Sequence, residues 1–324
     1  MLNAAEQIDN FDNAAAALGR ELAEMLWGVS PALKTQAYEV RLRVGQAVAL
    51  TLPSGQLFPF GEYRVDRRQM ETAFLSLCGN AVYSCQEDIA RGCITVGRGH
   101  RAGICGTAVL ENGRLKTIRD ISSINLRIAK EVKGCADRCI SLTLGDRLCS
   151  ILIAGAPCSG KTTLLRDIAC ALSGGRTVFG VKLPRRRISV IDERGELAAV
   201  RNGASNCDIG MCTDVLDGYP RSEGIINAVR YMSPELIICD EIGTQQDIEA
   251  LKGCVGSGVK IIASVHCGDK QELCLRPQCR QLLETGVFEK VVLLEQGMPP
   301  GRIAEIVDVR HGLFQNNATS KMIV

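Results

Sequence analysis

Helical and strand-like spacings of apolar residues are mixed in the first half of the chain. Apolar positions at steps of three and four predict one amphipathic helix that ends near Gly28 and Pro31. Its apolar positions are Ile8, Phe11, Ala15, Leu18, Leu22 and Met25. Met70, Phe74 and Leu77 mark a second helix. We expect the first helix to pack on its own domain or on a partner.

Alternating apolar and polar residues indicate strands around these helices. Strands are expected over residues 40–44, 47–52, 94–96, 102–110, 115–118 and 124–128. A glycine-rich segment over 97–101 and an Asn112-Gly113 turn join neighbouring strands. Because strands, helices and hairpins follow no strict alternation, this half of the chain is predicted to form an α+β domain.

A different rhythm begins after the polar segment 130–137, where we place a domain boundary. Apolar strand runs separated by helices cover 151–154, 188–191, 236–239, 260–264 and 291–294. This pattern is typical of an α/β domain with a parallel sheet, which binds ligands at the carboxyl ends of its strands. The predicted domains are therefore 1–134 and 135–324.

The composition of the chain limits the classes of partner and the cellular compartment that we expect. The 324 residues carry 38 basic and 36 acidic side chains, a net charge of +2, and only 4% aromatics. This balance gives no support to nucleic-acid binding. The 16 cysteines are scattered and form no C-x-x-C pair, which indicates a reducing compartment. With no signal-peptide pattern and no membrane-length apolar run, we expect a cytoplasmic protein.

The stretch SILIAGAPCSGKTTLL, residues 150–165, carries the spacing G-x-x-x-x-G-K-[ST]. This is the pattern of a phosphate-binding P-loop between a buried strand and a helix, and it predicts nucleotide binding. Backbone N–H groups would surround the phosphates, Lys161 would reach the β- and γ-phosphates, and Thr162 would ligate Mg²⁺. The expected nucleotide-binding residues are Gly155, Ala156, Pro157, Cys158, Ser159, Gly160, Lys161, Thr162 and Thr163.

Two carboxylates follow the apolar run 236–239. Asp240 and Glu241 match a Walker B arrangement, in which Asp240 orients Mg²⁺ and Glu241 activates the attacking water. The alternative is a pair of acids that cap the next helix. Because the P-loop lies in the same chain, we favour the catalytic interpretation.

Two further strand ends carry candidate residues. The run 188–191 is followed by Asp192, Glu193, Arg194, Gly195 and Glu196, which either contact Mg²⁺ or water or remain solvated loop charges. His266 follows the run 260–264 and either senses the γ-phosphate or serves the structure. Some first-half arginines are candidate arginine fingers, which neutralise transition-state charge across a subunit interface. They are Arg41, Arg43, Arg98, Arg101, Arg119 and Arg127.

The order of these motifs resembles that of the secretion ATPase superfamily, the motors of type II and type IV secretion and of type IV pili. Asp192 and Glu193 match the position of its Asp box, and residues 264–266 match its His box. The segment RYMSPELIICDE, residues 230–241, is similar to its Walker B region, although many members have glycine in place of Asp240.

The chain is more similar to the stage III sporulation protein AA family, from about residue 39 to about residue 308. The matching segments are EVRLRVGQ (39–46), HRAGICGTA (100–108), ISSINLRIA (121–129), GAPCSGKTTLLRD (155–167), VIDERGELA (190–198) and MSPELIICDEIG (232–243). The resemblance implies an α+β domain followed by a RecA-like ATPase domain in a homo-hexameric ring. It also implies ATP at subunit interfaces and a membrane-embedded channel as partner in the mother cell.

The resulting prediction is a Mg²⁺-dependent ATP hydrolase that drives assembly or transport across the forespore membranes. Two alternatives of other classes remain at this point. A RecA-like nucleic-acid motor would need a basic surface that tracks a strand. A nucleotide-gated scaffold with little turnover would not need Glu241 as a water activator.

Overall fold

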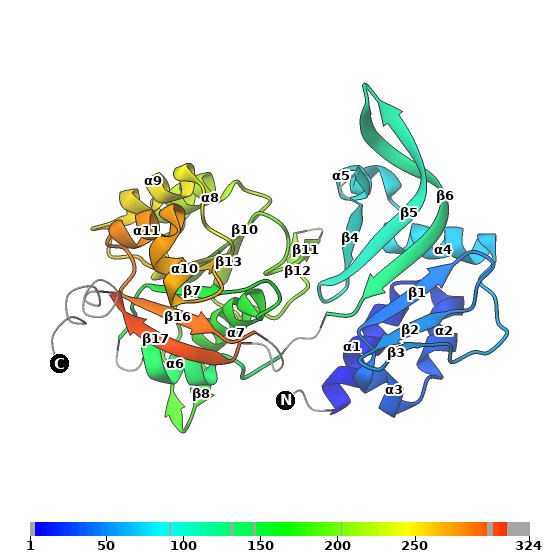
Figure 1. Cartoon of the computed structure of the whole chain (residues 1–324), viewed down its shortest axis with the longest axis horizontal. Coiled ribbons are helices and arrows are strands. Elements are labelled where there is room, and N and C mark those ends of the chain that lie inside the picture. The colour runs from blue at the N-terminus through cyan, green and yellow to red at the C-terminus, as the bar shows by residue number, and fades with distance from the viewer. Residues whose placement is uncertain are drawn as a thin grey trace, which may run out of the picture. The chain divides into compact units, whose positions relative to one another are not determined.

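The computed structural model describes residues 4–90, 92–129, 132–144, 147–201, 203–296 and 301–309. The chain divides into two compact units, Met1–Glu131 and Val132–Val324 (Figure 1). The first unit combines an antiparallel sheet with helices, and the second is built on a mostly parallel sheet. Both predicted fold classes, α+β and α/β, are confirmed.

The first unit holds a six-stranded antiparallel sheet in the order β3-β2-β1-β6-β5-β4. Its strands are β1 (Glu39–Arg43), β2 (Ala49–Leu52), β3 (Gly55–Leu57), β4 (Cys93–Val96), β5 (His100–Glu111) and β6 (Arg114–Arg127). Its helices are α1 (Ala4–Ala16), α2 (Arg20–Trp27), α3 (Pro31–Gln36), α4 (Arg67–Leu77), a 3₁₀ turn (Val82–Cys85) and α5 (Gln86–Ala90). Helical and strand residues share one apolar core.

The opening helix was predicted as one element, and this is wrong. It is split into α1 and α2, because Gly19 between them adopts φ +88°, a left-handed conformation that ends a helix. Phe11, Leu18 and Leu22 are nevertheless all buried in the same core. The apolar spacing therefore located the buried face correctly but could not reveal the change in direction.

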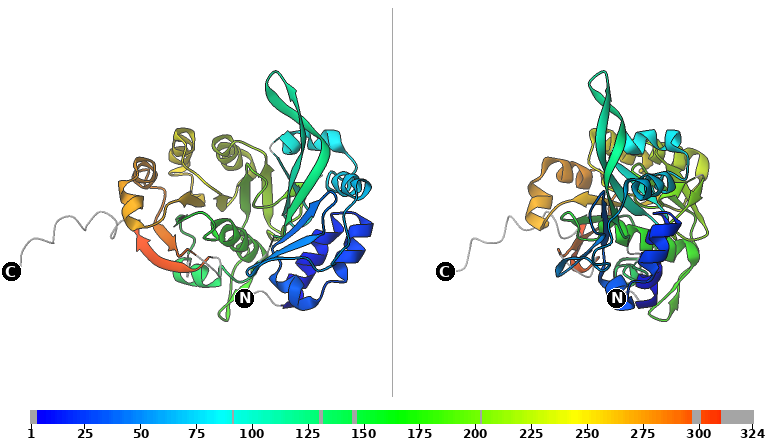
Figure 2. Two further views of the ribbon diagram at one scale, coloured as in Figure 1. Left: turned by 45° about the vertical axis from the view of Figure 1, so that its right-hand side comes forward. Right: turned by 90° about the vertical axis from the view of Figure 1, so that its right-hand side faces the viewer.

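The two strands expected over 115–118 and 124–128 are one continuous strand, β6. Asp120 interrupts the pattern with φ +48°, and the pairing with β5 shifts register between Cys105 and Thr107. A side chain at Gly106 would come within 2.6 Å of the Arg119 carbonyl oxygen. The irregularity is thus a bulge rather than a turn, and the β5–β6 hairpin extends past its neighbouring strands (Figures 1 and 2).

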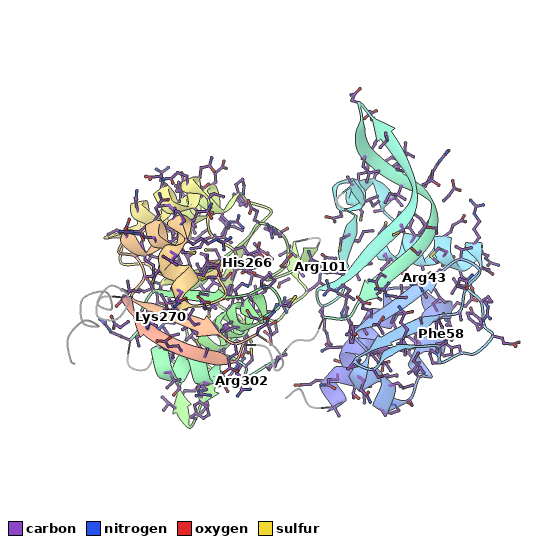
Figure 3. The ribbon with its side chains drawn as sticks, viewed as in Figure 1. Arg43, Phe58, Arg101, His266, Lys270 and Arg302 are labelled. Carbon is purple, nitrogen blue, oxygen red and sulfur yellow. The ribbon has the colours of Figure 1, made fainter. Side chains whose placement is uncertain are left out.

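One face of this sheet is polar and rich in arginine. Arg41 pairs with Asn125 across β1 and β6, and Arg101 pairs with Arg127 across β5 and β6. Directly paired residues lie on the same face, opposite the buried face that includes Val40. Figure 3 labels Arg43 and Arg101 on these strands.

The second unit has a seven-stranded sheet in the order β13-β10-β14-β15-β7-β16-β17. Its strands are β7 (Ile151–Gly155), β10 (Ile188–Asp192), β13 (Thr213–Asp217), β14 (Leu236–Cys239), β15 (Lys260–His266), β16 (Lys290–Leu294) and β17 (Ile303–Asp308). All pairs are parallel except β16 with β17. The sequence predicted five of these strands and missed the two edge strands, β13 and β17. Two short hairpins, β8 (Thr177–Val178) with β9 (Val181–Lys182) and β11 (Val200–Arg201) with β12 (Ala204–Ser205), lie outside this sheet.

Helices cover both faces of this sheet, each over its own apolar core. On one face lie α6 (Asp137–Thr143) and α7 (Lys161–Gly174). On the other lie α8 (Arg221–Asn227), a π-helical turn (Ala228–Met232), α9 (Gln245–Cys254), α10 (Lys270–Leu275) and α11 (Pro277–Glu284). The strand residues alternate between the two cores, as expected for a sheet buried on both sides.

The strand order decides which loops meet. β15 lies between β7 and β14, and β10 flanks β14 on the other side. These strands are parallel and in register, with His266 opposite Gly155 and Cys239 opposite Ile191. The four segments that the sequence singled out therefore leave the sheet side by side at one edge.

Candidate nucleotide-binding site

The P-loop turns tightly between β7 and α7. Gly160 has φ +91° and Cys158 has φ +63°, both left-handed. A Cβ at Gly155 would lie 2.4 Å from Oγ of Ser159, whose side chain is fully buried. These positions explain the residue types: Gly155 leaves room for Ser159, and Gly160 permits the backbone conformation that starts the helix.

Lys161 is buried at the start of α7, with 5% of its surface exposed. Its Nζ donates to the carbonyl oxygens of Gly155 and Ala156, each at 2.9 Å. A third contact joins Nζ to Nδ1 of His266 at 3.1 Å. The three donors of the ammonium group are thus all used. Burial lowers the pKa of Lys161, although the nearby charges of Asp240 and Glu241 oppose the shift.

His266 connects Lys161 to Glu241. Because an ammonium group can only donate, Nδ1 of His266 accepts from Lys161, and Nε2 then carries the proton. Nε2 lies 2.7 Å from Oε1 of Glu241 and donates to it. This bridge forms because β15, which ends in His266, lies between the strand of the P-loop and the strand that delivers Glu241.

Thr162 and Asp240, the predicted Mg²⁺ ligands, lie in contact. Oγ1 of Thr162 donates to Oδ2 of Asp240, and Oγ of Ser264 donates to Oδ1. A hydroxyl and a carboxylate beside a phosphate-binding loop are the oxygen donors that Mg²⁺ takes together with phosphates and waters. Among the described residues, no three His, Cys, Asp or Glu side chains form a metal cage of their own. The donor set thus fits Mg²⁺ held jointly with a nucleotide.

Glu241 adopts a left-handed backbone conformation with φ +54°. Its N–H donates to Oγ of Ser264 at 2.9 Å, and its Oε2 pairs with Nη1 of Arg194. Burial alone would raise the pKa of Glu241, but the hydrogen bond from His266 and the charge of Arg194 outweigh it and lower that pKa. The carboxylate is therefore ionised at neutral pH, as a water-activating base must be.

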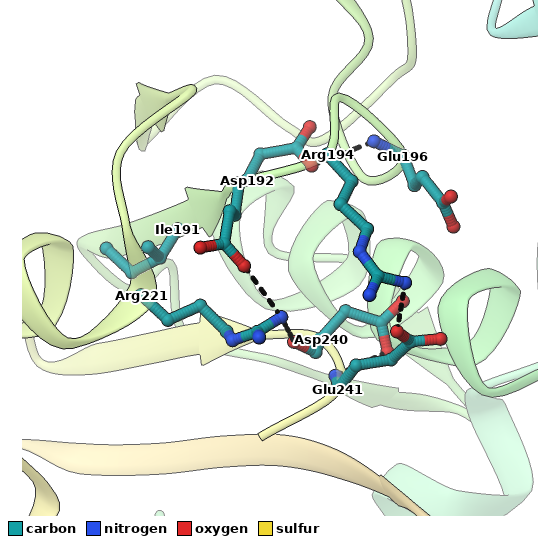
Figure 4. A pocket seen from close by; sticks show the side chains of 8 residues that line it. Ile191, Asp192, Arg194, Glu196, Arg221, Asp240 and Glu241 are labelled. Atoms are coloured by element: carbon teal, nitrogen blue, oxygen red, sulfur yellow. Dashed lines mark hydrogen bonds and ion pairs between the residues drawn. The ribbon is translucent and has the colours of Figure 1, made fainter. Parts of the chain in front are cut away.

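Asp192 and Glu193 have different surroundings. The buried Asp192 carboxylate accepts backbone N–H groups of residues 196, 197 and 198, at 2.8 to 3.2 Å. Oε2 of Glu193 pairs with Nη1 of Arg221 at 2.9 Å. Both residues line a pocket with Asp240 and Glu241 (Figure 4). Asp192 thus fixes the backbone of the loop after β10, whereas Glu193 lies in the pocket wall with Asp240 and Glu241.

The contacts of three residues at this edge were not predicted from the sequence. Arg194 was named only among the residues that follow the run 188–191, and Ser264 was named only as part of the His box. Arg221, the first residue of α8, is 11% exposed and also donates to the Asp240 carbonyl oxygen at 3.3 Å. The position of Arg194 just after a strand was a signal that it could lie at the site. No local sequence pattern indicates the same for Arg221.

A strand, P-loop and helix, with acidic strand ends beside them, define a RecA-like P-loop NTPase domain preceded by an α+β domain. The fold is similar to that of the Legionella pneumophila ATPase DotB, with a TM-score of 0.52 and 18% identity over 81% of this chain and 72% of that one. It is also similar to the pilus retraction motor PilT solved with ADP, with a TM-score of 0.53 and 13% identity over 79% of this chain and 74% of that one.

The family follows from the sequence match. The model of the family "Sporulation stage III, protein AA" matches residues 13–313, and the chain belongs to this family. A relative, stage III sporulation protein AA of Bacillus subtilis (strain 168), is 34% identical over 271 residues, which cover 83% of this chain and 86% of the relative. None of the helices in the described part of the chain has the length and apolar character to cross a membrane.

Proposed function

We propose that this protein is a Mg²⁺-dependent ATPase that hydrolyses ATP to ADP and phosphate. The observation that carries the proposal is the continuous chain of contacts from Lys161 through His266 to Glu241. It joins the side chain that would hold the phosphates to the side chain that would activate water. The contact between Thr162 and Asp240 beside it supplies the oxygens for the metal.

Each residue has a defined task in this scheme. Lys161 would exchange the carbonyl oxygens of Gly155 and Ala156 for phosphate oxygens, and the loop N–H groups would bind the same phosphates. Thr162 and Asp240 would hold Mg²⁺, which supplies positive charge against the phosphate oxygens when bound. Glu241 would orient the attacking water and accept its proton.

The residues around these groups would position them. His266 would report the arrival of phosphate at Lys161, because the contact between the two must change when the ammonium group turns to a new partner. Asp192 would fix the loop after β10, and Glu193 would support metal or water at the pocket edge. Cys158, Ser159 and Thr163 would complete the P-loop through their backbone groups.

The assembled form that we propose is a homo-hexameric ring with ATP at subunit interfaces. First-unit arginines of a neighbouring copy would complete each site. The polar sheet face with Arg41, Arg43, Arg101 and Arg127 supports this role, since it gathers several guanidinium groups on one surface. The ring would act in the mother-cell cytoplasm on membrane-embedded subunits of the sporulation channel.

Phosphate release from ATP, measured over a series of protein concentrations with and without Mg²⁺, tests this proposal. Molecular mass should be determined in parallel. We expect Mg²⁺-dependent release whose specific activity rises as a ring forms. Activity that does not change with concentration in a persistent monomer would contradict the shared site. ATP binding with no release at any concentration would instead support a nucleotide-gated scaffold.

A further inference from the structure

Arg194 sits in a loop whose backbone is fixed while its own side chain is exposed. The loop after β10 is closed by the Asp192 carboxylate, which binds the N–H groups of residues 196, 197 and 198. The Arg194 side chain is 57% exposed and reaches across to Glu241. A fixed backbone with a long, exposed side chain allows the guanidinium to change partners without moving the loop.

The partner of Arg194 is the carboxylate that would activate water. Nη1 of Arg194 contacts Oε2 of Glu241 (Figure 4). Oε1 of the same carboxylate accepts from His266. Both oxygens of this carboxylate are therefore occupied, and neither is open to a water while Arg194 remains paired with Glu241.

The position of this pair relative to the P-loop indicates a second partner. The contacts run from Arg194 to Glu241, then to His266, and then to Lys161 at the phosphate-binding loop. A water between Glu241 and a bound γ-phosphate would lie at this carboxylate. The guanidinium that touches the same carboxylate would therefore be within reach of a γ-phosphate bound there.

We propose that Arg194 binds the γ-phosphate of ATP within its own subunit, leaving Glu241 as it does so. The inference rests on the proposed function and deepens it. A terminal phosphate carries more charge than a carboxylate and accepts two parallel N–H bonds from a guanidinium. ADP lacks this group, so the pair between Arg194 and Glu241 persists with ADP. Arg194 thus makes the base available only when the substrate is complete.

Arg221, the other arginine of the pocket, is unsuited to this exchange. Its side chain is 11% exposed and pairs with Glu193 at 2.9 Å. It also donates to the Asp240 carbonyl oxygen and lies 3.7 Å from an oxygen of Asp247. These contacts fix Arg221 in the pocket wall, where it joins the segments after β10 and β14 to α9.

The test compares binding of ADP and of the β,γ-imido analogue of ATP by calorimetry, in Mg²⁺, to the full-length protein. We expect Arg194→Gln to weaken the analogue about tenfold or more while ADP affinity changes less than about twofold. Turnover at saturating ATP should fall by about a hundredfold. Arg194→Lys keeps one charge but not the bidentate geometry and should lose about threefold in analogue affinity.

Arg280→Gln is the matched control, because Arg280 is a similarly exposed arginine, 63%, paired with Glu284 on α11. It should leave both affinities and turnover unchanged. Equal losses for ADP and the analogue in Arg194→Gln would show a structural role and overturn the inference. Tighter analogue binding or faster turnover in that variant would show that Arg194 only restrains Glu241, which also overturns it. If the unmodified protein bound neither nucleotide, the proposed function would fail as well.

If Arg194→Gln does not fold, the nucleotide affinities of Arg194→Lys test the inference by themselves. A loss of analogue affinity without a loss of ADP affinity supports the inference, and wild-type affinity for both contradicts it.

Discussion

Oε1 of Glu241 accepts a hydrogen bond from Nε2 of His266 at 2.7 Å. The other ring nitrogen of His266 accepts from Lys161, so one imidazole touches both the lysine that we propose binds phosphate and the carboxylate that we propose activates water. A movement of Lys161 toward a bound phosphate would remove one of the two contacts that orient the ring. In the proposed mechanism, the state of the P-loop would thereby be transmitted to Glu241 across a single side chain.

Replacement of His266 should reduce catalysis more than binding. In His266→Leu, Glu241 loses the donor at Oε1 and Lys161 loses one of three acceptors. We expect the kcat for ATP hydrolysis to fall about tenfold to a hundredfold, with KM changed by less than about threefold. His266→Asn can restore one contact but cannot bridge both, so its kcat should be intermediate. Steady-state kinetics of both variants check this, and an unchanged kcat in His266→Leu would refute the proposed link.

Asp192 should matter first for stability. Its buried carboxylate accepts backbone N–H groups of three residues, of which Leu197 and Ala198 are buried and would lose their acceptor in Asp192→Ala. We expect this variant to lose about 3 kcal/mol in the free energy of unfolding, with Asp192→Asn losing roughly half as much. Urea unfolding of the full chain measures both.

Glu193→Gln is the control for this loop, because Glu193 is partly exposed and pairs with Arg221 instead of backbone groups. It should change the free energy of unfolding by less than about 1 kcal/mol. If Asp192→Asn left the free energy of unfolding unchanged but required more Mg²⁺ for turnover, this structural role would be contradicted and Asp192 would be assigned to the metal.

His100 should make the first unit sensitive to acid. The ring is fully buried, Nδ1 accepts from the Ala129 N–H at 2.9 Å, and Nε2 lies 3.1 Å from Oδ1 of Asn13. Burial, with a smaller effect of the Arg98 charge, lowers the pKa of His100 to about 4. The folded state therefore keeps this ring neutral where the unfolded chain already binds a proton.

The sign of the pH effect follows from this difference. Above the unfolded pKa of about 6.5, both states are neutral at His100 and stability is unaffected. As pH falls from about 6.5 to about 4, the unfolded state alone is protonated, and the free energy of unfolding decreases by up to about 3 kcal/mol. Urea unfolding between pH 7 and pH 4.5 should show this slope in the unmodified protein and lose it in His100→Gln. Equal slopes in the two proteins would contradict the assignment.

The sequence was sufficient to predict those features of the fold and the site that depend on residues close together in the chain. The P-loop, the strand ends at Asp240 and His266, and the helical face of Met70 depend on neighbouring residues, and the structure places them as expected. The sequence was insufficient to predict features that depend on contacts between segments far apart in the chain. The edge strands β13 and β17 are defined by their pairing partners, and Arg221 by contacts with Glu193 and Asp240. The break at Gly19 shows the same limit, because periodicity reports burial rather than direction.

The most direct test of the account identifies the nucleotide that remains bound after incubation with ATP and Mg²⁺ and removal of the free nucleotide. The unmodified protein should retain ADP, Glu241→Gln should retain ATP because the base is missing, and Lys161→Ala should retain neither because its phosphate contact is lost. This pattern would assign chemistry to Glu241 and binding to Lys161. ADP formed by Glu241→Gln as fast as by the unmodified protein would contradict the central claim that this carboxylate activates water.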